Sequence, residues 1–282
     1  MANQSPFVMP DTETLHVRDV YECISTHFSA TRTKSWPVVD AFLRSLEKGT
    51  VCADVGCGNG KNMVNRPELA LLGSDRSENL IKLCAQQNLE AAVADGLRLP
   101  YRSGSLGALI SIAVIHHFST VERRIIALQE LFRVLRPGGR GLIFVWSFER
   151  QAKPQPQQDA LISWTLDPRH AHTSIPAHAE STPKGIMLTR YYHLFAEGEL
   201  EALLERAIAG PDLLEYESML PGGAEAGCRR HPIRVVRTGA DHENWWAEIQ
   251  READVTPGEG ETGAPAREAD ASNPPKGSPR RE

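Results

Sequence analysis

The chain has 282 residues, 41% of them hydrophobic and 24% charged, which is ordinary for a globular protein and long enough for one sizeable core. Its formal net charge of −5 provides no overall positive field, so a polyanionic substrate would need a local basic surface or one supplied by a partner. The five cysteines form no C-x-x-C pair, no segment is apolar enough to cross a membrane, and the N-terminus lacks a secretory pattern, so we expect no metal site, no membrane span and an intracellular location, the cytoplasm first and the nucleus second.

The predicted elements begin after a polar N-terminal stretch, residues 1–14, which we expect to be disordered. Apolar residues at helical spacing predict one helix over 15–30 and a second over 38–46, opened by Pro37 and closed near Gly49. From residue 50 onward, short apolar runs alternate with helical stretches. The expected strands cover 51–55, 69–73, 91–94, 108–115 and 141–145, and the expected helices cover 78–87 and 121–135. This alternation predicts an α/β fold with a mainly parallel sheet.

The regular pattern ends at residue 150. Residues 150–184 are rich in Gln, Pro, His, Ala and Ser, which predicts a long mobile insertion. A strand over 187–195, a helix over 197–209, a second mobile insertion over 210–230 and a last strand over 233–237 are expected to follow. Residues 251–282 contain almost no large apolar side chains and predict a disordered tail, which leaves a single domain over 15–250.

A glycine cluster, Asp54-Val55-Gly56-Cys57-Gly58-Asn59-Gly60, ends the first expected strand. Parallel sheets bind ligands at the carboxyl ends of their strands, and glycines let the backbone turn tightly and approach a ligand. A dinucleotide fingerprint would require a further glycine where Lys61 stands. The spacing D-x-G-x-G-x-G instead resembles the first motif of class I S-adenosylmethionine-dependent methyltransferases, whose Rossmann-like fold is a mainly parallel seven-stranded sheet flanked by helices.

Acidic residues follow the next two expected strands. Asp75 can accept charge-assisted hydrogen bonds from both ribose hydroxyls of such a cofactor, and Asp95 can accept from the adenine amine. The alternative is that both residues only cap the helices that follow them. The expected cofactor-binding residues are Asp54, Gly56, Gly58, Gly60, Asp75, Arg76, Asp95, Gly96 and Ala113.

Several segments, inside and outside this pocket, resemble a narrower family. They are residues 21–37 (YECISTHFSATRTKSWP), 54–61, 73–77, 94–100, 110–118, 122–124, 190–195 (RYYHLF), 197–200 and 244–246 (NWW). They are similar to the wobble-uridine tRNA carboxymethyl methyltransferases, a family that includes a fungal enzyme and the methyltransferase half of the human AlkB-like tRNA hydroxylase. The similarity extends over roughly 15–149, 186–208 and 243–247.

This resemblance implies a reaction and two partners. The reaction is esterification of the carboxylate of 5-carboxymethyluridine at the tRNA wobble position, giving 5-methoxycarbonylmethyluridine. The partners are the anticodon stem-loop of tRNA and a small zinc-binding activator protein, with which the chain would form a heterodimer and which would carry the zinc. The sheet edge near residues 89–93 is a candidate docking site for the activator through strand addition.

The chemistry of this reaction suggests the catalytic residues. A carboxylate is already ionised at neutral pH, so it needs alignment with the methyl group and a cation to hold it rather than a base. Arg32 and Arg190 can hold a carboxylate with two parallel hydrogen bonds, and His116 ends the fourth strand where the methyl group is expected. These three are the candidate catalytic residues, with surface ion pairs and core packing as the alternatives.

Further residues are candidates for contact with the substrate. They are Lys34, Trp36, His117, Tyr191 and Tyr192, with Arg76, Arg123 and Arg124 as further phosphate contacts. Strand alternation would send Tyr191 and Tyr192 to opposite faces. For Trp36, Trp245 and Trp246, stacking on bases competes with packing of the chain onto the core.

Two other functions remain open from the residues alone. A class I methyltransferase acting on a small molecule, such as a quinone or a fatty acid, is consistent with the cofactor motifs and favoured by the negative charge, but the segment 32–36 argues against it. A non-catalytic scaffold that binds cofactor or partner is the second alternative. The complete set of Asp54, Asp75 and Asp95 argues against a scaffold, which need not keep the pocket.

Overall fold

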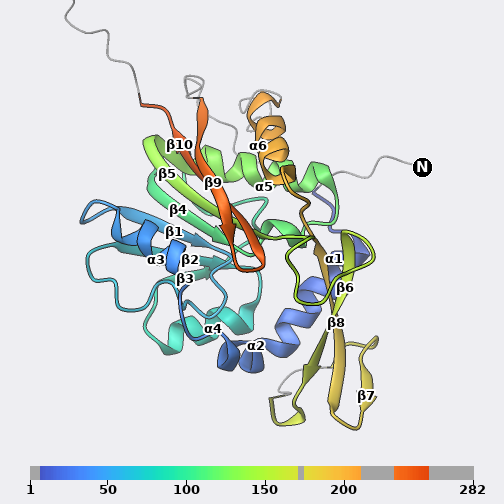
Figure 1. The fold of residues 1–282 in the computed structure, drawn as a ribbon. Coiled ribbons are helices and arrows are strands. Elements are labelled where there is room, and N and C mark those ends of the chain that lie inside the picture. Colours follow the sequence, from blue (N-terminus) through green and yellow to red (C-terminus); the bar gives the residue numbers. More distant parts are fainter. Residues whose placement is uncertain (1–6, 171–174, 211–231, 254–282) are drawn as a thin grey trace, which may run out of the picture.

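The computed structural model describes residues 7–170, 175–210 and 232–253. Its centre is a seven-stranded sheet with the strand order β3-β2-β1-β4-β5-β10-β9 (Figure 1). These strands are β1 (Val51–Val55), β2 (Ala70–Asp75), β3 (Ala91–Val93), β4 (Leu106–Ile112), β5 (Leu135–Trp146), β9 (Ile233–Asp241) and β10 (Asn244–Arg251). β1 to β5 run parallel, and β10 is antiparallel to both of its neighbours. The predicted fold, a mainly parallel seven-stranded sheet flanked by helices, is confirmed.

Helices cover both faces of this sheet. They are α1 (Asp11–Glu13), the π-helix η1 (Thr14–Arg18), α2 (Asp19–Thr31), α3 (Pro37–Arg44), α4 (Glu78–Gln86), α5 (Val121–Val134) and α6 (Glu199–Ala209), with 3-10 turns η2 (Ile115–His117) and η3 (Pro168–His170). One apolar cluster joins α5 and α6 to one face, and a second joins α3 to the other. β4 contributes Leu109 to the first cluster and Ala108 and Ile110 to the second, as expected for a strand buried on both sides. Within the described ranges, no helix is both long and apolar enough for a membrane span.

A second, smaller sheet stands beside the main one, with α2 between them (Figure 1). It consists of β6 (Asp159–Leu166), β7 (Glu180–Thr182) and β8 (Gly185–His193) in the antiparallel order β6-β8-β7. The prediction of a mobile insertion over 150–184 is therefore wrong for β6, η3 and β7. β6 buries Ala160 and Leu166 and partly buries Ile162 and Trp164, a period-two pattern that the surrounding Gln and Pro residues obscured.

The disorder predicted for the N-terminus extends too far along the sequence, because helical backbone begins at Asp11. Glu13 is 4% exposed and forms an ion pair with the buried Arg123 at 2.7 Å, so α1 is fastened to α5. Helical backbone over residues 11–14 contradicts the prediction for 1–14, because one carboxylate that meets a buried guanidinium can order a short polar segment. Residues 1–6 lie outside the described part of the chain.

The disordered C-terminal tail was predicted to begin at residue 251, which the structure places at the end of β10. Arg251, the last residue of β10, is 4% exposed, and its Nη1 donates to the Leu135 carbonyl at 2.7 Å. The remaining expectations, a mobile insertion over 210–230 and a disordered tail to residue 282, fall almost entirely on residues 211–231 and 254–282, which lie outside the described residues.

Candidate functional site

The carboxyl ends of β1, β2, β4 and β5 open into a cavity of about 710 Å³, which α2, β8 and the β9–β10 turn close from the other side. Most of the predicted site residues line it. They are Arg32, Lys34, Trp36, Gly56, Gly58, Asp75, Arg76, Asp95, Gly96, Ala113, His116, His117, Arg190 and Tyr192. Asp54, Gly60 and Tyr191 are not part of its lining.

The glycine loop after β1 forms one wall of the cavity. Gly56 has a φ of +75°, and a Cβ atom on it would lie 2.2 Å from the Val114 side chain, so only glycine fits between β1 and the end of β4. A Cβ atom on Gly60 would lie 2.4 Å from Leu89. Gly60 is therefore required for packing against the segment before β3, while Gly56 and Gly58 shape the cavity itself.

Asp75 is placed as an acceptor at the end of β2. Its Oδ2 accepts from the Gly58 N–H and its Oδ1 from the Ser77 N–H, both at 2.9 Å, which leaves each oxygen a further lone pair. The cap of α4 is Ser77, whose Oγ accepts from the Leu80 N–H. Asp75 is thus free of the capping role that was its alternative, and burial raises the pKa of its carboxyl despite the backbone hydrogen bonds.

Asp95 lies beside Asp75 at the end of β3. Its Oδ2 forms an ion pair with Arg76 at 2.9 Å, and its Oδ1 accepts from the Leu97 N–H. It precedes a turn rather than a helix, so helix capping does not explain it either. Gly96 faces the ring of Phe118, which a Cβ atom would approach to 3.2 Å. An acid and an apolar wall therefore meet at this end of the cavity.

Asp54 lies beneath the glycine loop and is fully buried. Its Oδ2 accepts from Asn62 Nδ2 at 3.4 Å, and burial raises its pKa to about 7. Its other oxygen and the side-chain oxygen of Asn62 are buried and have no partner among the described residues. Asn62 lines the cavity. The Asn62 oxygen can therefore accept from a positively charged amino group at this end of the cavity, and the Asp54 carboxylate lies behind it.

Two sets of hydrogen bonds fasten α2 across the cavity. Asn59 Nδ2, in the glycine loop, donates to the Arg32 carbonyl at 3.1 Å and to Ser29 Oγ at 3.0 Å. At the other end of the helix, Glu22 accepts from Ser77 Oγ at 2.5 Å. The segment 21–37 and the glycine loop, separate in the sequence, therefore form one site, with the partly exposed Arg32 at its rim.

His116 carries a free hydrogen-bond donor. Its Nδ1 accepts from the Trp146 N–H at 3.1 Å, and burial lowers its pKa well below the ordinary value, so the ring is neutral and its proton is on Nε2. This Nε2–H has no partner among the described residues. His116 is completely buried and lines the cavity, so it can donate to a ligand without being an acid.

His117 is occupied on both sides by protein groups. Its Nδ1 faces the Tyr191 carbonyl at 2.9 Å and must donate, and burial lowers its pKa to about 3, so its Nε2 accepts from the Tyr21 hydroxyl at 3.0 Å. The Tyr21 oxygen in turn accepts from the Tyr192 hydroxyl at 3.2 Å. His117 therefore orients a chain of hydroxyls, and the free donor for a ligand belongs to His116.

Arg190 places a positive charge inside the cavity. It is 4% exposed, and its guanidinium lies 4.7 Å from the Trp164 ring centre and 5.2 Å from that of Tyr192. Within the described part of the chain, no carboxylate pairs with it, and its Nε has no hydrogen-bond partner. A buried, unpaired cation is costly, so a ligand with an anionic group is the natural partner for it.

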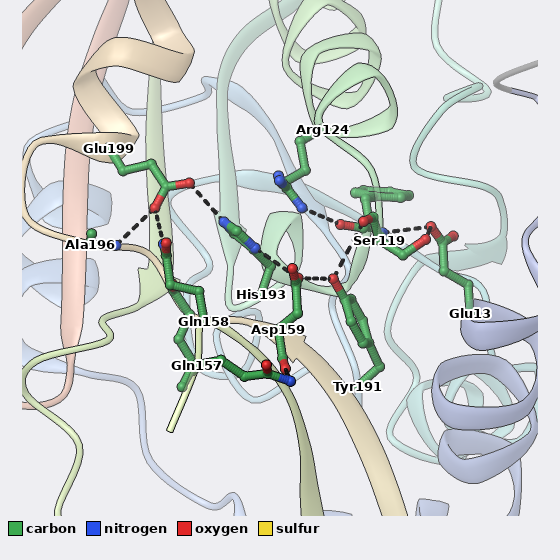
Figure 2. Close-up of polar contacts among 12 residues, drawn as sticks. Glu13, Ser119, Arg124, Gln157, Gln158, Asp159, Tyr191, His193, Ala196 and Glu199 are labelled. Atoms are coloured by element: carbon green, nitrogen blue, oxygen red, sulfur yellow. Dashed lines mark hydrogen bonds and ion pairs between the residues drawn. The ribbon is translucent and has the colours of Figure 1, made fainter. Parts of the chain in front are cut away.

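The remaining candidates divide between the cavity and the core. Lys34 and Trp36 line the cavity, and Lys61 Nζ lies 4.9 Å from the Trp36 ring centre. Tyr191 lies on the reverse face of β8 and donates to Asp159 (Figure 2). Arg123 and Arg124 were predicted to contact phosphate groups. This prediction is wrong, because the two side chains are only 2% and 4% exposed.

The tryptophans near the C-terminal end of the described chain belong to the core. Trp245 Nε1 donates to the Phe195 carbonyl, and Trp246 stacks on Phe144 with ring centres 6.3 Å apart. Two roles were predicted for these tryptophans, stacking on bases and packing of the chain onto the core. The structure confirms the packing.

Several residues that line the cavity were not among the predicted site residues. Asn62 and Lys61 directly follow the glycine loop, and Tyr21 lies in the segment already singled out on α2. Trp146 ends β5, and its position at the carboxyl end of a parallel strand was the available signal. The β9–β10 turn, residues 242–244, offered no local signal that it would reach the cavity.

Comparisons with known proteins agree with this geometry. A model of the methyltransferase-domain family (Methyltransf_11) matches residues 53–143, which contain the glycine loop, Asp75 and Asp95. Among solved structures, the chain is similar to the cyclase SpnF, with a TM-score of 0.54 and 13% identity over 87% of this chain and 98% of that one. At this level of identity the similarity shows the fold alone.

Two curated relatives are much more similar in sequence. The tRNA (carboxymethyluridine(34)-5-O)-methyltransferase alkbh8 of Xenopus tropicalis is 41% identical over 68% of this chain, which spans 37% of that protein's length. The tRNA (carboxymethyluridine(34)-5-O)-methyltransferase of Schizosaccharomyces pombe is 37% identical over 83% of this chain and 95% of its own length. The similarity to the fungal protein extends over nearly its whole length, and the chain belongs to the tRNA (carboxymethyluridine(34)-5-O)-methyltransferase family.

Proposed function

We propose that this chain transfers the methyl group of S-adenosylmethionine to the carboxylate of 5-carboxymethyluridine at the tRNA wobble position, giving 5-methoxycarbonylmethyluridine. The observation that carries the proposal is Arg190, a buried cation without a carboxylate partner among the described residues. A guanidinium in this setting binds a carboxylate through two parallel charge-assisted hydrogen bonds. The His116 Nε2–H supplies a further donor in the same cavity.

The other half of the cavity fits the cofactor. Asp75 would hold the two ribose hydroxyls with its free lone pairs, and Asp95 with Gly96 would hold the adenine. The side-chain oxygen of Asn62 would accept from the amino group of its amino acid end, with the Asp54 carboxylate behind it. When bound, S-adenosylmethionine would supply an electrophilic methyl group on a sulfonium ion.

The protonation states in the cavity suit this reaction. Esterification of an ionised carboxylate moves no proton, so the site needs no general base. Both His116 and His117 are neutral, because burial lowers their pKa values. The chain's own contribution is to hold and align the carboxylate with Arg190 and His116 and to keep water out, and alignment of this kind accounts for large rate gains.

The deciding experiment is a methyl-transfer assay with the purified full chain, with and without a zinc-binding activator protein. The substrate is tRNA that carries 5-carboxymethyluridine, and nucleoside mass spectrometry identifies the product. We expect 5-methoxycarbonylmethyluridine to appear. Transfer to small carboxylic acids but not to this tRNA would support the small-molecule alternative, and failure to bind S-adenosylmethionine in calorimetry would support the scaffold alternative.

The exposed edge of the main sheet is the proposed docking site of the activator. β3 ends the sheet and pairs only with β2 among the described strands, and Val93 is 52% exposed. An open edge of this kind accepts a further strand through backbone hydrogen bonds. Val93→Pro should therefore reduce co-purification with the activator, whereas Val236→Pro on the opposite edge strand, β9, should leave it unchanged.

A further inference from the structure

The reverse face of β8 carries a polar cluster that the proposed reaction does not use. β8 presents Arg190 and Tyr192 to the cavity, whereas Tyr191 and His193 point the other way. Figure 2 shows His193 between two carboxylates, Asp159 at the start of β6 and Glu199 at the start of α6. The cluster therefore joins two strands of the small sheet, β6 and β8, to a helix that packs on the main sheet.

Two hydrogen-bonding contacts hold the His193 ring in place. Its Nδ1 lies 2.9 Å from Asp159 Oδ1 and its Nε2 lies 2.7 Å from Glu199 Oε1. Burial raises the pKa of both carboxyls, but hydrogen bonds, including those from His193, outweigh it and lower both pKa values, so both carboxylates are ionised at neutral pH. Ionised carboxylates only accept hydrogen bonds, so Asp159 and Glu199 both depend on the His193 ring for these contacts.

The cluster continues into the cavity through Tyr191. The Tyr191 hydroxyl donates to Asp159 (Figure 2), which fixes this residue from the reverse face. The carbonyl of the same residue accepts from His117 Nδ1 at 2.9 Å, and His117 orients Tyr21 and Tyr192. Asp159 is thereby connected to the Tyr192 hydroxyl through Tyr191, His117 and Tyr21, with hydrogen bonds between successive residues.

We propose that His193, held between Asp159 and Glu199, is a positioning residue that determines where Arg190 and Tyr192 stand in the cavity. This inference rests on the proposed function, because it concerns the residues that would hold the substrate carboxylate. A side chain on one face of a strand cannot shift without moving its neighbours on the other face. Loss of the two contacts releases the end of β8 from β6 and α6, and the guanidinium of Arg190 moves with it.

The test compares His193→Phe with a matched control, Glu130→Gln. Glu130 is 1% exposed and forms a buried ion pair with Arg133 at 2.6 Å on α5, and it does not line the cavity. Each change removes polar contacts of a buried side chain and should lower the Tm. Only His193→Phe should reduce kcat/KM for the tRNA, by about tenfold to 100-fold, since small misplacements of substrate-holding groups are costly.

Cofactor affinity and a conservative variant complete the kinetic test. The Kd for S-adenosylmethionine should stay within about twofold of the wild type in His193→Phe, because the cofactor half of the cavity is built from other elements. His193→Gln keeps one N–H donor and should recover part of the lost kcat/KM. If Glu130→Gln and His193→Phe lower kcat/KM equally, the role of His193 is merely structural and the inference is overturned.

A second readout needs no turnover. The Nε–H of Arg190 is buried, so its nitrogen–proton NMR signal, assigned with Arg190→Lys, reports the position of the guanidinium. We expect the signal to shift or broaden in His193→Phe and to remain in place in Glu130→Gln. An unchanged signal in His193→Phe overturns the inference even if the enzyme assay is positive. A changed signal without any methyl transfer by the wild type supports the inference while the proposed function fails.

Discussion

The two halves of the cavity differ in how their polar groups are satisfied. In the cofactor half, Asp75 and Asp95 already accept hydrogen bonds from backbone N–H groups at most 17 residues away, and the orphaned oxygens of Asp54 and Asn62 lie in the same stretch of chain. In the substrate half, His116 Nε2, Arg190 Nε and the side-chain oxygen of Asn244 are buried and have no partner among the described residues. The first half is largely prepared by local structure, whereas the second is assembled from distant elements and leaves polar groups for a substrate to satisfy.

The largest expected effect lies in the cofactor half. Asp75→Ala removes the acceptor for both ribose hydroxyls and leaves the Gly58 and Ser77 N–H groups unpaired. Two charge-assisted hydrogen bonds correspond to a loss of about 100-fold or more in affinity for S-adenosylmethionine. Isothermal calorimetry measures this directly, and an unchanged Kd would contradict the assignment of this half to the cofactor.

The second prediction concerns the substrate half of the cavity. Arg190→Gln removes the buried cation and should lower kcat/KM for the tRNA by about tenfold to 100-fold, the worth of a charge-assisted contact. Cofactor affinity should not change, because Arg190 lies on β8. Arg190→Lys serves as the control, since it keeps the charge but not the paired donors. Equal losses in cofactor binding and transfer would mean that the halves are not separate.

The third prediction concerns pH in the cofactor half. Because burial raises the pKa of Asp54 to about 7, this carboxyl is mostly protonated near pH 6 and mostly ionised near pH 8. Only the ionised form attracts the positive charge of a nearby ammonium group, so the affinity for S-adenosylmethionine should rise by up to about tenfold over this range. Asp54→Asn cannot ionise and should lose this rise. If the pH profiles of the wild type and Asp54→Asn were parallel, the group that titrates would not be Asp54.

The smallest effect is expected at the rim of the substrate half. Arg32 is partly exposed, and its guanidinium lies 5.5 Å from the Phe28 ring centre. Exposed charges are screened by water and salt, so Arg32→Ala should raise the KM for tRNA by only about twofold to fivefold. Its carbonyl, which accepts from Asn59, is retained, and cofactor affinity should therefore persist. A loss of cofactor binding would instead assign Arg32 to the cofactor half of the cavity.

The same division explains how much of the molecule could be predicted. Gly56, Asp75 and Asp95 follow successive strands, so their spacing alone indicated a pocket. The roles of His116 and His117 could not be predicted, because they depend on whether the Trp146 N–H or the Tyr191 carbonyl approaches each ring. The ordering of Glu13 depends in the same way on Arg123, which lies far along the chain.

The small sheet was missed for a different reason. Ala160, Ile162, Trp164 and Leu166 alternate as a strand requires, but only pairing with β8 makes that short pattern decisive. Composition favoured an insertion, and composition carries no information about a pairing partner that lies some distance away.

The position of the β9–β10 turn has a consequence for the order of events during synthesis. The cavity is bounded by residues from Met9 to Asn244, almost the entire described chain. Pairing of distant segments closes the largest loops and is therefore slow to form. The cavity wall is completed when β10 inserts between β5 and β9. A nascent chain of which only the β1–β4 region has been synthesised therefore contains the glycine loop, but its cavity still lacks the wall that the β9–β10 turn provides.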